Sequence, residues 1–151
     1  MRVKDVMTRH PACGTPDTNL YTIAGLMVEK GCGAVPIVKS PETMALVGIV
    51  TDRDITCRIV ARGDDPMRKI AADCMSSPVI TVRLDESLED CRLAMEHHKV
   101  RRIPVIDEDG ACCGIVSLAD VAEWSQYEES AEVVMAVSHG PRTGSRFAAV
   151  S

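Results

Sequence analysis

The chain has 151 residues, a formal net charge of −5 at pH 7, 46% hydrophobic residues and 26% charged residues. No apolar run approaches the roughly 20 residues that a membrane-spanning helix needs, and the mean hydropathy of +0.03 is typical of a soluble globular protein. The acidic balance and an aromatic content of 3% exclude a general nucleic-acid-binding protein, which would show a basic stripe or stacking rings. Because no charged and then apolar leader opens the chain, we expect a cytoplasmic protein.

The first half of the chain predicts an extended entry, a helix, two strands and a second helix. Their expected ranges are Val3–Thr8, Pro16–Lys30, Ala34–Val38, Leu46–Val50 and Asp52–Arg62. Apolar residues at i, i+3, i+4 and i+7 indicate the first helix, and a glycine follows each helix, as is typical of a helix C-terminus. The strands are short apolar runs on either side of a proline-containing turn.

The second half of the chain repeats this order of elements. Its expected elements are a strand over Val79–Val82, a helix over Ser87–His97, a hairpin over Arg102–Val116 and a helix that begins near Leu118. The run Gly48–Ile55 returns as Gly114–Val121, and the segments Met7–Asp17 and Met75–Asp85 have the same length. A unit of about 60 residues buries little surface alone, so we expect the two copies to share one core.

We therefore divide the chain into a first copy (1–63), a linker (64–69), a second copy (70–126) and a C-terminal helix with a flexible tail (127–151). In the last part, Glu128–Ser138 predicts an amphipathic helix that packs on the rest, and residues 139–151 have the composition of a frayed tail. A docking role for a partner protein is the alternative interpretation of this C-terminal part.

Seven cysteines are spread over the chain: Cys13, Cys32, Cys57, Cys74, Cys91, Cys112 and Cys113. Their number is odd and no pair has metal-ligand spacing, so the sequence predicts neither a disulfide framework nor a metal site. Most stand at apolar positions of the pattern, and we interpret them as small core residues in a reducing compartment. The role of the adjacent pair Cys112–Cys113 stays open.

Each repeated run places a hydroxyl residue directly after a strand and an acid three residues later. The pairs are Thr51 with Asp54 and Ser117 with Asp120. Such a pair forms an ordinary N-terminal capping box. It also brings a hydroxyl and helix N–H groups to the carboxyl end of a strand, where a phosphate binds, and its carboxylate can accept hydrogen bonds from both hydroxyls of a ribose.

The basic residues beside the two pairs differ. Arg53 lies within the first repeated run as a phosphate partner, since its planar guanidinium matches a phosphate. The second run has Leu118 and Ala119 there, so that Arg101 and Arg102 are its nearest basic candidates. We therefore expect two unequal sites.

No motif in the chain indicates a reaction centre. The run Gly31-Cys-Gly33 is not a dinucleotide fingerprint, because Pro36 stands where the third glycine is required and the run ends a helix instead of opening one. A P-loop and a nucleophile–histidine set in a motif context are absent as well. We expect a protein that is not an enzyme.

The combined motifs closely resemble tandem CBS (cystathionine β-synthase) domains, a pair called a Bateman module. The resemblance covers both copies and rests on Val6-Met7-Thr8, Pro16-Asp17-Thr18, Val35-Pro36-Ile37-Val38 and Gly48-Ile-Val-Thr-Asp-Arg-Asp54. It implies an α/β (α+β) fold of two β-α-β-β-α repeats, paired through their sheets about a pseudo-twofold axis. It also implies a cleft between the repeats that binds adenosine derivatives.

Carried over to this sequence, the resemblance implies that Asp54 and Asp120 hold ribose hydroxyls and that Thr51 and Ser117 hold a phosphate. It further implies a first adenine slot lined by Thr15, Cys32, Gly33 and Ala34, and a second lined by Thr81, Val100, Arg101 and Arg102. Pro36 and Pro104, at equivalent positions of the two copies, complete the expected nucleotide-binding set together with Arg53.

Three classes of function remain to be compared. The first is a regulatory, non-enzymatic sensor that binds AMP, ADP or ATP and changes the shape or pairing of a homodimer. The alternative is a dimerisation or protein-interaction module whose clefts are empty or purely structural. An enzyme is the third class: the sequence is similar to the regulatory insert of inosine monophosphate dehydrogenase, but 151 residues leave no room for a barrel of about 250 residues beside two CBS units. S-adenosylmethionine and dinucleotides remain open as ligands, and the regulated protein is not named by the sequence.

Overall fold

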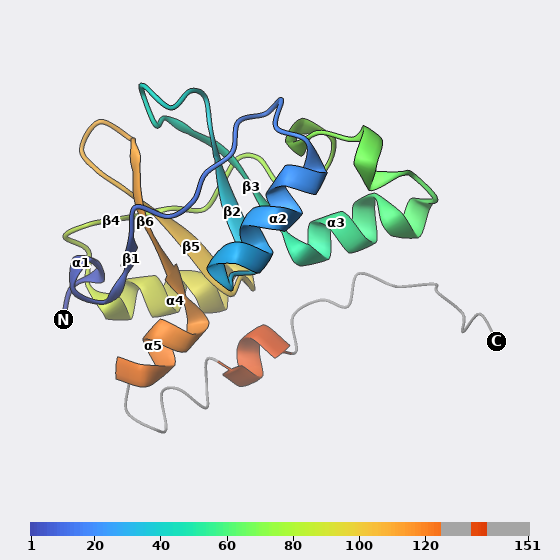
Figure 1. Ribbon diagram of the computed structural model, residues 1–151. Helices are drawn as coiled ribbons and strands as arrows, with labels where there is room; N and C mark the ends of the chain where they lie inside the picture. Colours follow the sequence, from blue (N-terminus) through green and yellow to red (C-terminus); the bar gives the residue numbers. More distant parts are fainter. Residues whose placement is uncertain (125–133, 139–151) are drawn as a thin grey trace.

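This computed structural model describes residues 1–124 and 134–138 (Figure 1). The first copy contains α1 (Val3–Val6), β1 (Thr8–Arg9), α2 (Leu20–Lys30), β2 (Ala34–Val38), β3 (Leu46–Thr51) and α3 (Asp52–Arg58). Three 3₁₀ turns follow, η1 (Val60–Arg62), η2 (Pro66–Arg68) and η3 (Ala71–Asp73). The second copy contains β4 (Val82–Arg83), α4 (Leu88–His98), β5 (Arg102–Ile106), β6 (Cys112–Ser117) and α5 (Leu118–Trp124).

The two long helices begin and end at residues with a clear local cause. The Asn19 side chain accepts a hydrogen bond from the Tyr21 N–H at the start of α2, and Gly31 ends that helix in the left-handed conformation at φ 61°. The Ser87 side chain accepts from the Asp90 N–H at the start of α4. Each cap supplies a partner to backbone groups that a helix end leaves unpaired.

Some predicted elements differ from the observed ones. The extended entry over Val3–Thr8 is wrong, because residues 3–6 form the short helix α1 before β1 begins. The helix predicted over Asp52–Arg62 divides into α3 and η1 at Ile59. Of the strand predicted over Val79–Val82, only its last residue lies in β4.

The C-terminal part is described only in part. Residues 134–138 are helical, and the rest of the predicted helix Glu128–Ser138 and the tail 139–151 lie outside the described residues. None of the described helices is long and apolar enough to cross a membrane.

The sheets show that each copy receives its edge segment from the other. In the second copy the strand order is β1-β6-β5-β4, and β1, which belongs to the first copy, pairs antiparallel with β6 through Thr8 and Ile115. In the first copy β2 and β3 form a hairpin, and Ser76 from the second copy pairs antiparallel with Ile49. The two exchanges are equivalent, which makes the sheets related by a pseudo-twofold axis.

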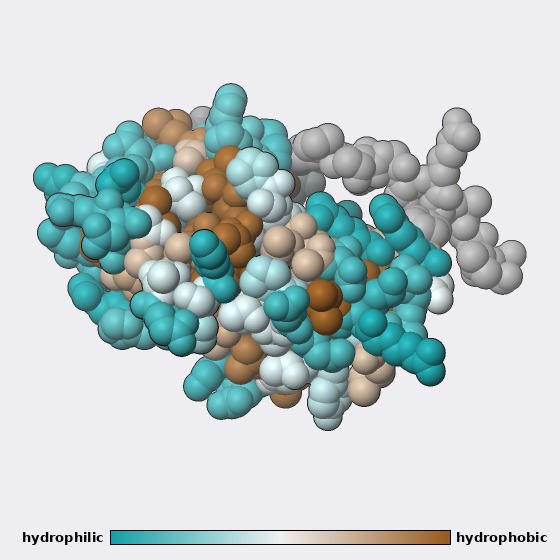
Figure 2. All heavy atoms as spheres, turned by 90° about the horizontal axis from the view of Figure 1, so that it is seen from above, coloured by the Kyte–Doolittle hydropathy of each residue, from teal (hydrophilic) through white to brown (hydrophobic). Residues whose placement is uncertain are grey.

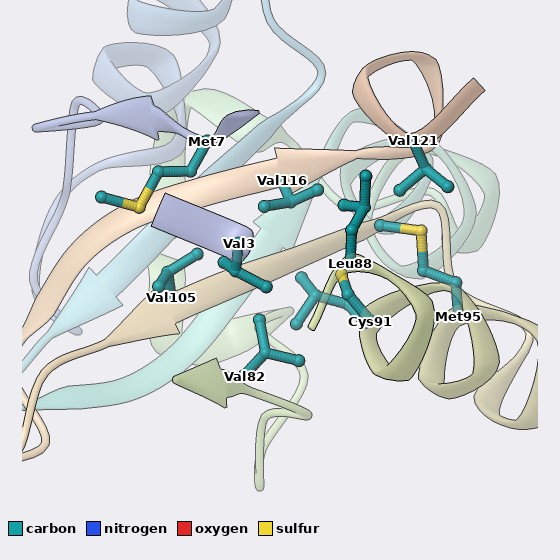
Figure 3. Packing of buried hydrophobic residues seen from close by; sticks show 10 residues of the cluster. Val3, Met7, Val82, Leu88, Cys91, Met95, Val105, Val116 and Val121 are labelled. Carbon is teal, nitrogen blue, oxygen red and sulfur yellow. The ribbon is translucent and has the colours of Figure 1, made fainter. Parts of the chain in front are cut away.

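The hydrophobic cores follow the same exchange. In the second core, Val3 and Met7 from the N-terminus pack with Val105 and Val116 (Figure 3). In the first core, Cys74 from the start of the second copy packs with Leu20, Ile23 and their neighbours. Each core is therefore completed by side chains from both copies. The boundaries of the copies at residues 63 and 70 remain a prediction from the sequence repeat.

A methionine from one copy lies against a glycine of the other at both crossing points. The Met75 Sδ atom is 2.6 Å from the position that a Cβ atom at Gly48 would occupy. The Met7 Sδ atom lies even closer to the corresponding Cβ position at Gly114, and the Thr8 carbonyl oxygen is 3.2 Å from that position. A Cβ atom at either glycine would displace the methionine side chain that lies against it.

We predict that Gly114→Ala lowers the free energy of unfolding by about 1–3 kcal/mol, because it overpacks this crossing point. Gly25→Ala is the control: its Cβ meets no atom within 4 Å, and alanine in a helix interior is expected to stabilise by about 0.5–1 kcal/mol. Urea unfolding measures both changes. Equal stability of Gly114→Ala and the wild type would contradict the tight crossing.

Candidate functional site

Both hydroxyl–acid pairs form the predicted capping boxes. The Thr51 N–H donates to the Asp54 Oδ2 atom at 2.9 Å and the Asp54 N–H donates to the Thr51 hydroxyl at 3.1 Å. In the second copy, the Ser117 N–H and hydroxyl both donate to the Asp120 Oδ2 atom, at 2.7 and 2.8 Å. The boxes hold each acid at the start of the helix that follows β3 or β6.

Asp54 and Asp120 differ in the partner of their second carboxylate oxygen, Oδ1. The Asp54 Oδ1 atom lies 3.7 Å from the Arg58 Nε atom in an i,i+4 ion pair. Within residues 1–124 and 134–138, no hydrogen bond is described to the Asp120 Oδ1 atom. The capping bonds of Asp120 therefore involve one carboxylate oxygen, whereas both oxygens of Asp54 have a partner.

A cleft of about 590 Å³ lies between the copies, next to Asp120. The first copy contributes Thr8, His10, Pro11, Ala12, Lys30, Gly31, Cys32 and Ala34. The second copy contributes Arg101, Arg102, Ile115, Ser117, Leu118, Ala119 and Asp120. We call this space the inter-copy cleft. Its size and its mixed apolar and polar lining are those of a small-molecule site.

The inter-copy cleft is basic although the chain as a whole is acidic. Lys30, Arg101 and Arg102 place three formal positive charges around it, and Asp120 is its one acidic lining residue. A cleft with this charge balance attracts an anion, and arginine side chains match phosphate oxygens in geometry.

The structure groups the predicted residues differently from the sequence-based assignment. Cys32 and Ala34, assigned to the first adenine slot, line the inter-copy cleft together with Ser117 and Asp120. Thr15 lines a separate smaller pocket with Thr18 and Met44. The reason is the exchange of entry segments, which brings the loop after α2 of the first copy opposite the helix start of the second.

The pseudo-twofold axis relates the inter-copy cleft to a second region around Thr51 and Asp54. There Ser76 exchanges two backbone hydrogen bonds with Ile49, at 2.9 and 3.1 Å, as Thr8 pairs with Ile115 beside the inter-copy cleft. Arg102 Nη2 is 2.8 Å from the position that a Cβ atom at Gly33 would occupy, and so is Asp52 Oδ2. Arg102 thus lies between the two regions.

The remaining predicted residues occupy different settings. Arg53 is exposed in the first turn of α3, at the position equivalent to Ala119 of the inter-copy cleft. Pro36 and Pro104 are buried within β2 and β5, where they pair with Ile49 and Ile115. Thr81 and Val100 are half-buried. Val100 is equivalent to Cys32 in the repeat, and it packs against the second hydrophobic core.

Sequence reasoning missed Lys30 and the segment from Thr8 to Ala12 as parts of the cleft. These residues belong to the first copy, whereas the acid that they face belongs to the second. The signal that points to them is a methionine and a glycine that recur in both copies and meet across them, Met7 with Gly114 and Met75 with Gly48. When a methionine and a glycine recur in both copies, the methionine of one copy can pack against the glycine of the other. This recurrence indicates that the copies exchange their entry segments.

Comparison with known families identifies the repeat. The CBS domain model matches residues 3–61 and again residues 70–127. The chain belongs to the CBS domain family. It is 36% identical over 129 residues to the CBS domain-containing protein YhcV of Bacillus subtilis, which covers 85% of this chain and 89% of that protein. It spans 63% of the length of another relative, the uncharacterised protein MK0525 of Methanopyrus kandleri.

Solved structures with this fold carry chemically different ligands. Hypoxic response protein I with two zinc ions is 32% identical, with a TM-score of 0.73 over 83% of this chain and 100% of that one. CBSX2 with AMP, from Arabidopsis thaliana, is 28% identical, with a TM-score of 0.68 over 81% and 93%. The CBS pair of MJ0100 with methylthioadenosine and S-adenosylmethionine is 25% identical, with a TM-score of 0.73 over 82% and 94%. The CBS pair itself therefore does not decide the ligand.

The likeness to an enzyme covers only a small part of that enzyme. Inosine-5'-monophosphate dehydrogenase of Bacillus subtilis is 25% identical over 118 residues, which are 78% of this chain but 23% of the enzyme. In the part of the chain that the structure describes, no group of three or more His, Cys, Asp and Glu side chains could hold a metal ion.

The capping geometry predicts the effect of removing a cleft hydroxyl. Ser117→Ala loses both hydrogen bonds of the Ser117 hydroxyl, so we expect the free energy of unfolding to fall by about 1 kcal/mol. Thr22→Ala, at an exposed position of α2, is the control and should change it by less than about 0.5 kcal/mol. Thermal unfolding measures both. A larger loss in the control would contradict the capping role.

Proposed function

We propose that the protein is a regulatory module, not an enzyme, that binds a phosphorylated adenosine in the inter-copy cleft. AMP, ADP and ATP are the ligands that we propose. Binding then changes the relative position of the two copies, and through it the activity of a target protein. The cleft is built from both copies, so a ligand that fills it contacts both at once.

The observation that carries this proposal is the position of Asp120 beside basic side chains of both copies. The carboxylate accepts its capping bonds at Oδ2, and Oδ1 is then an acceptor for ribose hydroxyls. Arg101 and Lys30 line the same cleft and supply positive charge to the phosphate. A single cleft thus offers an acceptor for the ribose and positive charge for the phosphate of a nucleotide.

The charge balance favours a phosphorylated ligand over other adenosines. S-adenosylmethionine carries a sulfonium cation, and methylthioadenosine has no anionic group. Three formal positive charges against one negative charge in the lining repel the former and leave the latter without an ionic partner. The second candidate function is a dimerisation module with an empty or purely structural cleft, which requires no affinity for a nucleotide. The calorimetric titrations described below distinguish the two functions.

We predict that Asp120→Ala weakens AMP binding about tenfold to a hundredfold, because hydrogen bonds to an ionised group contribute about 1.5–3 kcal/mol. In the wild type, 2'-deoxy-AMP should bind more weakly than AMP, and in the variant the two should bind alike. Isothermal titration calorimetry on the full chain measures these affinities.

Asp90→Ala is the matched control for that experiment. Asp90 forms the equivalent capping pair with Ser87 at the start of α4, and it does not line the inter-copy cleft. The control therefore loses the same kind of cap but should keep wild-type affinity. Two results would show that Asp120 acts only as a helix cap. One is an equal loss of AMP affinity in Asp90→Ala and Asp120→Ala, and the other is equal affinity of the wild type for AMP and 2'-deoxy-AMP.

We also propose that the protein is a homodimer. Tyr21 and Val28 on α2 are 66% and 85% exposed, and Val60 and Met67 on the neighbouring turns are 53% and 56% exposed. Light scattering at micromolar concentration should give twice the chain mass of 16.3 kDa. Val28→Glu should lower the mass to that of one chain, and the control Glu108→Lys, at an exposed position between β5 and β6, should not. A measured mass of one chain for the wild-type protein would contradict the proposed homodimer.

A further inference from the structure

Arg58, in the last turn of α3, joins the acid of the first capping box to a segment of the other copy. Its Nε atom lies 3.7 Å from the Asp54 Oδ1 atom. Its Nη1 atom donates to the Cys74 carbonyl at 3.0 Å and lies 3.5 Å from the Met75 carbonyl oxygen. A guanidinium has five N–H donors in a fixed plane, so it can serve an acid and a carbonyl at the same time. The side chain therefore links α3 to the chain that follows η3.

The carbonyls beside Arg58 belong to the segment that crosses into the first copy. Met75 packs against the glycine of β3, and Ser76 exchanges two backbone hydrogen bonds with Ile49 of the same strand. The inter-copy cleft is lined in the same way by a crossing segment of one copy and a helix start of the other. A nucleotide bound around Asp54 would therefore have to contact the two parts of the chain that Arg58 already joins.

Both carboxylate oxygens of Asp54 have a partner within the chain. The Oδ2 atom accepts a hydrogen bond from the Thr51 N–H, and the Oδ1 atom faces Arg58. The Asp54 side chain is only 13% exposed, so salt screens this ion pair less than a pair on the open surface. A ribose that bound to the Oδ1 atom would have to displace the guanidinium and leave the cation without its acid.

The second copy has a tryptophan at the equivalent position. Trp124 stands four residues after Asp120, which is the spacing that separates Arg58 from the acid of its own box. The tryptophan is 54% exposed, and its indole carries no charge and has a single N–H donor. The positive charge near Asp120 comes instead from the residues that line the inter-copy cleft. Only in the first copy does the following helical turn supply a cation to the acid of the box.

We infer that Arg58 takes the place of a ligand in the region around Asp54, so that each chain binds one nucleotide, in the inter-copy cleft. The number of one per chain rests on the proposed function, whereas the closure of the region around Asp54 does not. The chain itself joins the copies on the Arg58 side of the pseudo-twofold axis. A nucleotide then changes the contacts between the copies on the other side only.

The test is a calorimetric titration of the full chain with AMP. We expect one AMP per chain in the wild type and two in Arg58→Ala, because the variant leaves the Asp54 Oδ1 atom available to a ribose. Adding Asp54→Ala to Arg58→Ala should return the number to one. Two AMP per chain in the wild type, or one in Arg58→Ala, would overturn the inference.

Arg62→Ala is the matched control. Arg62 is exposed in η1, four residues after Arg58, so this variant removes the same charge from the same part of the molecule. It should bind one AMP per chain, and two would overturn the role of Arg58. Figure 2 shows a largely hydrophilic surface at the end of the molecule where α3 and the 3₁₀ turns lie in Figure 1, which favours folding of both variants.

The reverse change in the second copy decides the question if Arg58→Ala does not fold. Trp124→Arg brings a guanidinium to the position equivalent to Arg58, where it should pair with Asp120. AMP affinity should then fall about tenfold or more, the scale of hydrogen bonds to an ionised group, and the preference for AMP over 2'-deoxy-AMP should disappear. Trp124→Gln removes the ring without adding a charge and should keep that preference. A wild-type preference in Trp124→Arg would contradict the inference.

The titrations separate this inference from the proposed function. If the wild type binds no AMP and Arg58→Ala binds one, the inter-copy cleft is not a nucleotide site, but Arg58 still closes the region around Asp54. If both proteins bind one AMP, the proposed function stands and the inference fails. If neither protein binds AMP, both fail.

Discussion

The contact on which the rest of the structure depends is the crossing of each entry segment into the opposite copy. Met7 lies against Gly114 and Met75 against Gly48, so β1 is able to pair with β6 and Ser76 with Ile49. Both sheets gain their outer partner from this exchange, and both cores gain side chains. The space between the copies is a consequence of the crossing, because the crossing segments form one of its walls.

The acids at the helix starts combine two roles that are often assigned to different residues. Asp120 caps its helix through one oxygen, and this fixes the direction of the other. An acid that the fold already holds loses little conformational freedom when a ligand arrives. Asp54 is held in the same way but also faces Arg58, and it is preceded in α3 by Arg53, whereas Asp120 is preceded in α5 by Ala119. The two equivalent capping boxes thus offer different surroundings to a ligand.

Much of the fold follows from the sequence, and the limits have physical reasons. Apolar periodicity predicted α2, which is long enough to show a period, short apolar runs predicted the hairpin of the first copy, and the repeat predicted α4 and the second hairpin. It failed for Val3–Val6, where four residues cannot distinguish a helix turn from an extended segment. The hydroxyl–acid pairs were recognised because they recur. The grouping of Cys32 and Ala34 with Asp120 was missed because repetition reveals equivalent residues but does not say which copy each one faces.

The exchange of entry segments also sets an order in which the protein can be completed during synthesis. The first core needs Ala71 and Cys74, which leave the ribosome midway. The second core needs Val3, before the first strand of the repeat, and Val121, in its last helix. Strand β1 therefore waits without its partner until β6 emerges, and an unpaired strand edge is where nascent chains associate wrongly. The two copies share one architecture, yet the core of the first copy can close once residue 75 has been made, whereas the core of the second copy requires Val121.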